Sequence, residues 1–138
     1  MKCKALVLTH GELAGAFVQA VELILGRNDL LQYKNLPVCL DIENYKREIE
    51  EILEENRETG VLVITDLLGG SPFLTCSSLA QKHWEEMELI TGCNLQMLLA
   101  VTDAIEEKTV AELKEIAVEA GRNGIVDLKS QMKEVQKD

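Results

Sequence analysis

The sequence lacks an uninterrupted apolar run long enough to cross a membrane. Its first apolar stretch, at residues 5–8, is soon broken by His10 and Glu12, so it forms neither the core of a signal peptide nor a membrane span. Basic residues are scarce as well, since 14 lysines and arginines face 24 aspartates and glutamates, for a net charge of −10. Nucleic acids and anionic membranes are recognised through basic surfaces, so neither is expected as a main partner. We expect a cytoplasmic protein whose partners offer basic or apolar surfaces.

The sequence also lacks the common signatures of metal and nucleotide binding. Its four cysteines form no C-x-x-C pair and no cluster with histidine at metal-ligand spacing: Cys3, Cys39, Cys76 and Cys93. We interpret them as reduced thiols in the core, and we expect no metal. The P-loop motif is missing too, so direct use of ATP is not indicated and no cofactor is expected.

What the sequence does contain is an alternation of short apolar runs and longer amphipathic stretches. A length of 138 residues with 46% hydrophobic residues is typical of a single domain, here residues 1–138. The alternation predicts an α/β fold: a doubly wound, mostly parallel sheet with helices on both faces. The expected strands are residues 5–8, 37–40, 61–64, 87–90 and 125–128. Helices are expected at residues 13–24 and 42–53, from about residue 95, and at residues 110–120, where Gly121 ends the helix. A further helix is expected to begin with Ser71 as its N-cap and Pro72 as its first residue, and to run toward Trp84.

Two polar junctions follow the first and third of these strands. They are residues 9–12, which include His10, and residues 65–72, which include Asp66 and a Gly-Gly-Ser-Pro turn. In open parallel sheets the ligand site lies beyond the carboxyl ends of the strands. If the two strands are neighbours, His10 and Asp66 lie side by side.

A histidine at this place can act as a nucleophile. One imidazole nitrogen can accept an electrophile while the other donates a hydrogen bond that fixes the tautomer, and Asp66 is the candidate acceptor of that bond. The N–H groups at the helix start near Ser71, with those of Gly11 and Glu12, can hold phosphoryl oxygens. A structural histidine and an ordinary capped turn are the alternatives. His83, which precedes Trp84, is expected to have a packing or surface role.

The chain resembles the mannose-type enzyme IIA components of the bacterial phosphoenolpyruvate-dependent sugar phosphotransferase system (PTS). The likeness covers nearly the whole chain. It is carried by four blocks of sequence: residues 9–14 (Thr-His-Gly-Glu-Leu-Ala), 65–73 (Thr-Asp-Leu-Leu-Gly-Gly-Ser-Pro-Phe), 91–95 (Thr-Gly-Cys-Asn-Leu) and 117–122 (Ala-Val-Glu-Ala-Gly-Arg).

The resemblance implies a phosphoryl carrier. His10 is then phosphorylated on Nε2 and Asp66 is bonded to Nδ1, with Thr9, Gly11, Gly70 and Ser71 as phosphoryl-binding residues. The donor is the phosphorylated carrier protein HPr and the acceptor is enzyme IIB, which serves the membrane sugar transporter IIC/IID. The resemblance further implies a homodimer in which the last strand, at residues 125–128, lies antiparallel to the others and can be exchanged between subunits.

One departure and two alternatives accompany the resemblance. The family usually has proline where this chain has Gln96, near the expected start of a helix, where either residue is tolerated. The alternatives are a phosphocarrier that feeds a dihydroxyacetone kinase and a phosphorylation-sensing regulatory domain. A hydrolase that uses Ser71 is disfavoured, because Gly-Gly-Ser-Pro is not a G-x-S-x-G elbow.

Overall fold

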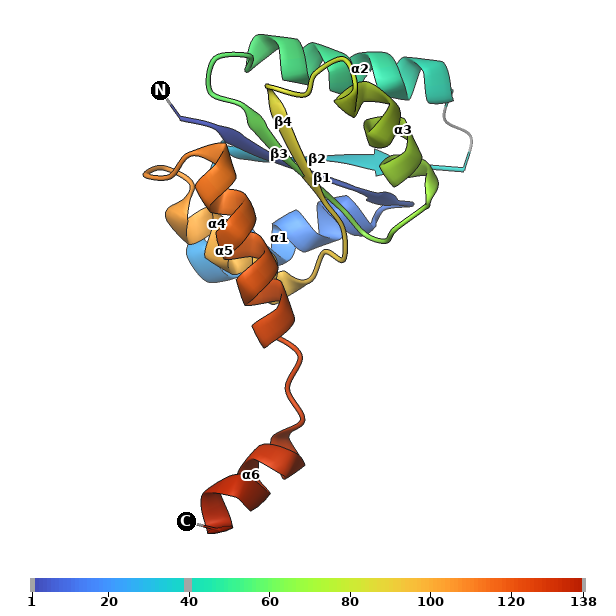
Figure 1. The fold of residues 1–138 in the computed structure, drawn as a ribbon. Helices are drawn as coiled ribbons and strands as arrows, with labels where there is room; N and C mark the ends of the chain where they lie inside the picture. The colour runs from blue at the N-terminus through green and yellow to red at the C-terminus, as the bar shows by residue number, and fades with distance from the viewer. Residues whose placement is uncertain (1, 39–40, 138) are drawn as a thin grey trace.

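Four parallel strands form the central sheet in a computed structural model, which describes residues 2–38 and 41–137 (Figure 1). The described strands are β1 (Lys4–His10), β2 (Leu31–Leu36), β3 (Val61–Thr65) and β4 (Met87–Ile90), in the spatial order β2-β1-β3-β4. The described helices are α1 (Leu13–Leu25), α2 (Ile42–Glu55), α3 (Ser71–Ala80), α4 (Leu95–Ala104), α5 (Val110–Asn123) and α6 (Leu128–Lys137). The predicted α/β fold with a parallel sheet is confirmed.

Helices cover both faces of the sheet, as predicted. Figure 1 shows α2 and α3 on one face and α1, α4 and α5 on the other. In β1 the side chains of Ala5 and Val7 pack with α1, α4 and α5, whereas Leu6 and Leu8 pack with α2 and α3. Because both faces are buried, the central strands read as continuous apolar runs rather than as an alternating pattern.

The register of the two central strands sets the position of the functional residues. β1 pairs directly with β3, and Leu8 lies opposite Thr65. The residues that follow these two positions therefore leave the sheet side by side at its carboxyl edge. This is the edge at which ligands bind in open parallel sheets.

The prediction of a strand at residues 37–40 is wrong. The observed strand, β2, ends just before these residues. Pro37 and Val38 are outside any strand, while Cys39 and Leu40 lie outside the described residues. β2 contains polar Gln32, Lys34 and Asn35 and occupies an edge of the sheet, where most of its residues are only partly buried. Apolar content alone therefore pointed to the wrong residues, because an edge strand tolerates polar ones.

The strand predicted at residues 125–128 is also absent. Residues 125–127 have no regular structure, and α6 begins at Leu128. Asp127 caps this helix, because its carboxylate accepts hydrogen bonds from the Ser130 N–H at 3.1 Å and from the Ser130 hydroxyl at 2.8 Å. Figure 1 shows α6 extending away from the sheet. The described chain thus presents no antiparallel fifth strand, and the outer edge of β4 is left without a described neighbour.

Two helix ends differ from the prediction. α3 has Gly70 as its N-cap, with Ser71 and Pro72 as its first two residues, and it ends at Ala80 instead of near Trp84. α5 continues through Gly121 to Asn123. A Cβ at position 121 would lie 2.8 Å from Met97 Cε, so this glycine permits close packing of α5 against α4 instead of stopping the helix.

No helix among the described residues combines the length and the apolar composition that a membrane crossing needs.

Candidate functional site

His10 and Asp66 are hydrogen-bonded to each other at the carboxyl edge of the sheet. His10 ends β1 with its side chain 47% exposed, and Asp66 follows β3 with its side chain 11% exposed. His10 Nδ1 lies 2.8 Å from Asp66 Oδ2, and the same oxygen accepts the His10 backbone N–H at 2.9 Å. Since an ionised carboxylate only accepts hydrogen bonds, Nδ1 carries the ring proton. The lone pair on Nε2 is therefore free for an incoming electrophile.

Asp66 is held in its ionised form. Its burial alone would raise its pKa, but the hydrogen bonds from His10 and from the Leu67 N–H, the latter at 3.0 Å to Oδ1, outweigh burial and lower the pKa. The carboxylate is thus charged at neutral pH. Because the folded pKa is depressed, its contribution to stability is complete above the usual value of 3.8 and is lost as the pH falls through the lowered pKa.

Gly70 lies against the free edge of the imidazole. A Cβ at position 70 would stand 2.9 Å from His10 Nε2 and closer still to Cε1, so only glycine fits this contact. Gly70 is also the N-cap of α3, whose first N–H groups have no partner within the helix. Pro72 has no N–H, which leaves those of Ser71 and Phe73. The helix start thus offers anion-binding donors next to the residue that contacts His10 Nε2.

Thr9 and Gly11 hold the end of β1 from within the fold. Thr9 is fully buried, and its hydroxyl donates to the His10 carbonyl oxygen at 3.2 Å. Gly11, with φ +55°, exchanges two hydrogen bonds of 2.9 Å with Leu36, one through its N–H and one through its carbonyl. The Thr9 hydroxyl and the Gly11 backbone therefore fix the main chain on either side of His10. Their hydrogen bonds are already made within the protein.

The described thiols do not compete with His10 as nucleophiles. Cys3, Cys76 and Cys93 are free and at least partly buried, as predicted, while Cys39 lies outside the described residues. Burial raises the pKa of Cys76 to about 12, and burial together with the charge of Asp66 does the same for Cys93. These two thiols stay protonated at neutral pH, and protonated thiols are poor nucleophiles.

Sequence reasoning missed an apolar rim on the loop and helix that follow Asp66. Leu67, Leu68 and Leu74 are 51%, 73% and 58% exposed. Two consecutive leucines in a loop otherwise made of glycine and polar residues were the available signal. We call these three residues the leucine rim.

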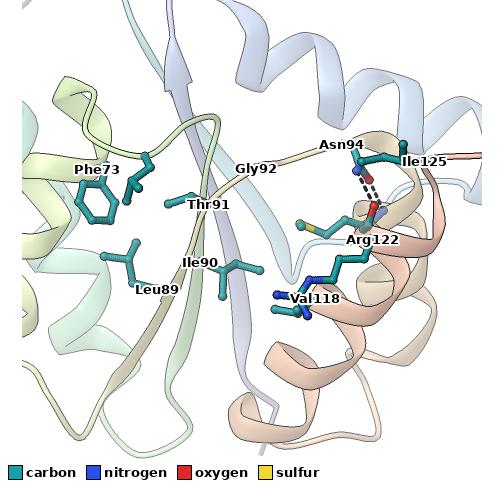
Figure 2. Close-up of a pocket in the computed structure, with 12 residues that line it drawn as sticks. Phe73, Leu89, Ile90, Thr91, Gly92, Asn94, Val118, Arg122 and Ile125 are labelled. Carbon is teal, nitrogen blue, oxygen red and sulfur yellow. Dashed lines mark hydrogen bonds between the residues drawn. The ribbon is translucent and has the colours of Figure 1, made fainter.

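A separate cavity of about 510 Å³ lies beside β4 and contains neither His10 nor Asp66 (Figure 2). Figure 2 shows Leu89, Ile90 and Thr91 on one side and Val118 and Arg122 on the other. Arg122 is the one charged residue among those that line the cavity, and Ile125 is also part of the lining. The cavity is mainly apolar and follows the outer edge of the sheet.

Comparison with known proteins gives related matches in sequence and in structure, of which four are described. A family model, EIIA-man, described as the PTS system fructose IIA component, matches residues 4–118. The mannose-specific PTS EIIAB component of Escherichia coli K12 is 31% identical over 129 residues, which are 88% of this chain and 38% of that protein. This chain therefore spans less than two fifths of the length of that relative.

The other two matches are nearer to this chain in length. The sorbose-specific PTS EIIA component of Lacticaseibacillus casei is 26% identical over 108 residues, 78% of each chain. The crystal structure of a phosphotransferase system component EIIA from Streptococcus agalactiae superposes with a TM-score of 0.83 at 24% identity, covering 93% of this chain and 98% of that one. At this identity the superposition establishes the shared fold.

Proposed function

The chain belongs to the EIIA-man family of PTS components, and on that premise we propose that it is a phosphoryl carrier that is loaded on His10 and unloaded to another protein. The observation that carries the proposal is the 2.8 Å contact between His10 Nδ1 and Asp66 Oδ2, which leaves Nε2 as the nucleophile. We further propose that residues 1–138 act as one cytoplasmic domain in this role.

In the proposed reaction the phosphoryl group moves in line between two imidazoles. The bond from phosphorus to the donor's histidine breaks as the bond from phosphorus to His10 Nε2 forms, and the donor imidazole leaves with its own electron pair. The His10 ring becomes cationic, and its Nδ1 proton stays hydrogen-bonded to the charged Asp66. The protein then contributes mainly positioning and electrostatic stabilisation.

The start of α3 is proposed to hold the phosphoryl oxygens. Ser71 and Phe73 follow Gly70, which lies against the free edge of the ring, so their N–H groups and the Ser71 hydroxyl are the candidate donors. A helix N-terminus stabilises an anion by about 0.3–2 kcal/mol, which is enough to hold the group without trapping it. Thr9 and Gly11 are proposed to act one step further away, by fixing the backbone of His10.

Gly70→Ala is expected to slow loading while the fold is kept. The added methyl group occupies the space beside Nε2, so we expect phosphoryl transfer to slow by about tenfold or more, in line with the sensitivity of such reactions to small misplacements. The measurement is the rate of labelling by phosphorylated HPr, with circular dichroism as the test of folding.

Gly69→Ala is the matched control for this prediction. Its methyl group enters the same loop where no heavy atom lies within 4 Å, although the positive φ of 92° there costs a non-glycine residue about 1–2 kcal/mol of stability. We expect it to slow labelling less than Gly70→Ala does. Equal rates for Gly70→Ala and the natural chain would contradict the placement of the phosphoryl group beside Gly70.

The proposed partners are HPr as donor and enzyme IIB as acceptor, which serves a IIC/IID sugar transporter. The leucine rim beside His10 offers an apolar surface to both, and the net charge of −10 favours partners with basic surfaces. The E. coli relative is named an EIIAB component, and the named relatives are mannose- and sorbose-specific. These names favour a role in sugar transport over one that feeds a dihydroxyacetone kinase.

We also propose that two copies of the chain form a homodimer through the outer edge of β4. This edge has no described strand beside it and is followed by the mainly apolar cavity, while Ile125 and Val126 are 82% and 52% exposed. An unpaired strand edge readily pairs with a strand from another chain. In the dimer, the apolar segment at residues 125–128 of one copy covers the edge of the other.

The double substitution Ile125→Asp and Val126→Asp is expected to convert the dimer into a monomer. Each substitution removes an apolar side chain from the dimer contact and puts a charge there that must lose its water. This cost in free energy outweighs the gain from backbone pairing along a short strand. Sedimentation equilibrium measures the mass of the natural and substituted chains. A substituted chain that stays dimeric would place the interface elsewhere.

A further inference from the structure

Three side chains from two segments meet at the edge of the sheet opposite to His10. Glu50 and Glu54 lie one turn apart on α2, and His83 lies between the end of α3 and the start of β4. Their donor atoms all lie within 4.8 Å of one another. His83 follows Ala80 and precedes Met87, so it lies at the amino ends of the strands. This cluster is therefore remote from the proposed phosphoryl site.

His83 is the centre of the cluster. Its side chain is 2% exposed, and its Nε2 lies 3.2 Å from Glu50 Oε1. Its other ring nitrogen, Nδ1, faces Glu86 Oε2 at 3.8 Å. At metal sites one histidine nitrogen commonly binds the ion while the other faces an outer carboxylate. Here Nε2 contacts Glu50, and Glu86 is the carboxylate that Nδ1 faces.

We propose that Glu50, Glu54 and His83 bind a zinc ion. Zinc takes histidine nitrogen and carboxylate oxygen at about 2.0–2.2 Å, so two of its ligands in a tetrahedron stand roughly 3.3–3.5 Å apart. The separation of 3.2 Å between His83 Nε2 and Glu50 Oε1 is close to this spacing. Glu54 is exposed and can turn inward to supply the third ligand, and water supplies the fourth.

Two basic side chains already pair with carboxylates around the cluster, and a metal ion must displace one of them. The Lys82 ammonium pairs with Glu50, and Arg57 Nε lies 3.4 Å from Glu86. Glu50 also accepts a hydrogen bond from Lys82, so its carboxylate is already placed against a positive charge. Lys82 is 66% exposed and can swing into solvent, so its ammonium is a displaceable cation at the position of the metal.

The backbone holds His83 in place before any ion binds. The His83 N–H donates to the Leu79 carbonyl at 2.9 Å, and its own carbonyl accepts the Glu86 N–H at 3.0 Å. On the facing helix, Ile49 and Leu53 are fully buried and anchor the turn that carries the two glutamates. Such fixed ligands lower the ordering cost of binding.

Titration of the full chain with zinc chloride in a calorimeter tests the proposal. We expect one zinc ion per chain, and a dissociation constant at least about tenfold higher in Glu54→Gln, since even the loss of an outer partner commonly costs 10–100-fold. Glu55→Gln removes the same charge from the next exposed position of α2, outside the cluster, and is expected to bind zinc as the natural chain does. Equal dissociation constants for these two variants would overturn the proposal.

Two more variants distinguish a zinc site from a purely structural network of ion pairs. Lys82→Met removes the competing cation and is expected to tighten zinc binding, whereas a structural network predicts lower thermal stability and no such gain. His10→Ala is expected to bind zinc unchanged, because His10 is not part of the cluster. Absence of zinc binding in the natural chain, or its loss in His10→Ala, would contradict the assignment of the ion to these three residues.

Discussion

Replacing His10 by alanine is expected to abolish labelling of the chain by phosphorylated HPr. The chain has two histidines, and the other, His83, is only 2% exposed and faces Glu50 and Glu86 through its two ring nitrogens. No second imidazole is therefore accessible to a protein donor. The measurement is the intact mass of the chain after incubation with enzyme I, HPr and phosphoenolpyruvate, and we expect no mass increase in the variant.

Folding and the chemistry of the label are the controls for this experiment. His10 is half exposed, so circular dichroism of the variant is expected to match that of the natural chain. In the natural chain the label should be lost in acid and kept in base, because a phosphorus–nitrogen bond is acid-labile whereas phosphoserine resists acid. A mass increase that persists in His10→Ala would move the phosphoryl site to another residue.

Asp66→Asn is expected to keep the fold and to slow phosphoryl transfer by about 10–100-fold. The amide can still reach the imidazole, but it carries no charge to stabilise the cationic ring that forms when Nε2 is phosphorylated. A hydrogen bond to a charged group contributes about 1.5–3 kcal/mol, and each 1.36 kcal/mol is tenfold in rate. Rapid-quench measurement of transfer from phosphorylated HPr gives the rate.

Asp103→Asn is the matched control, because it makes the same chemical change at an exposed position of α4. It is expected to transfer at the natural rate. If Asp66→Asn also transfers at the natural rate, the carboxylate has no part in the reaction and only the position of His10 matters.

The pairing of His10 with Asp66 could be predicted from sequence because it depends on few assumptions. Each residue follows a β-branched or leucine-rich run that forms a buried strand, and the carboxyl ends of parallel neighbours meet at one edge. The sequence did not show that the two strands are neighbours. In the structure β1 pairs with β3, with Leu8 opposite Thr65. The apolar strand pattern and the general rule for ligand sites in α/β folds were together sufficient to predict that His10 and Asp66 lie close together.

Other features depended on contacts between distant segments and could not be derived in this way. An edge strand tolerates polar residues, so β2 at Leu31–Leu36 left only a weak apolar signal. A strand at residues 125–128 needs a neighbouring edge, and in the single chain Asp127 caps a helix instead. Gly70 has no side chain, so its residue type alone does not indicate a contact with His10. Glu50 and His83 are 33 residues apart and meet only through the packing of α2 beside the end of α3.

One oxygen of Asp66 accepts both the backbone N–H and the ring nitrogen of the same histidine. This double attachment fixes the imidazole relative to its own main chain, so the ring cannot turn over to offer the wrong nitrogen. We therefore expect the loaded and empty forms of the carrier to share one side-chain geometry. The shuttle then needs little rearrangement in either direction, which suits a relay whose steps must run readily both forward and back.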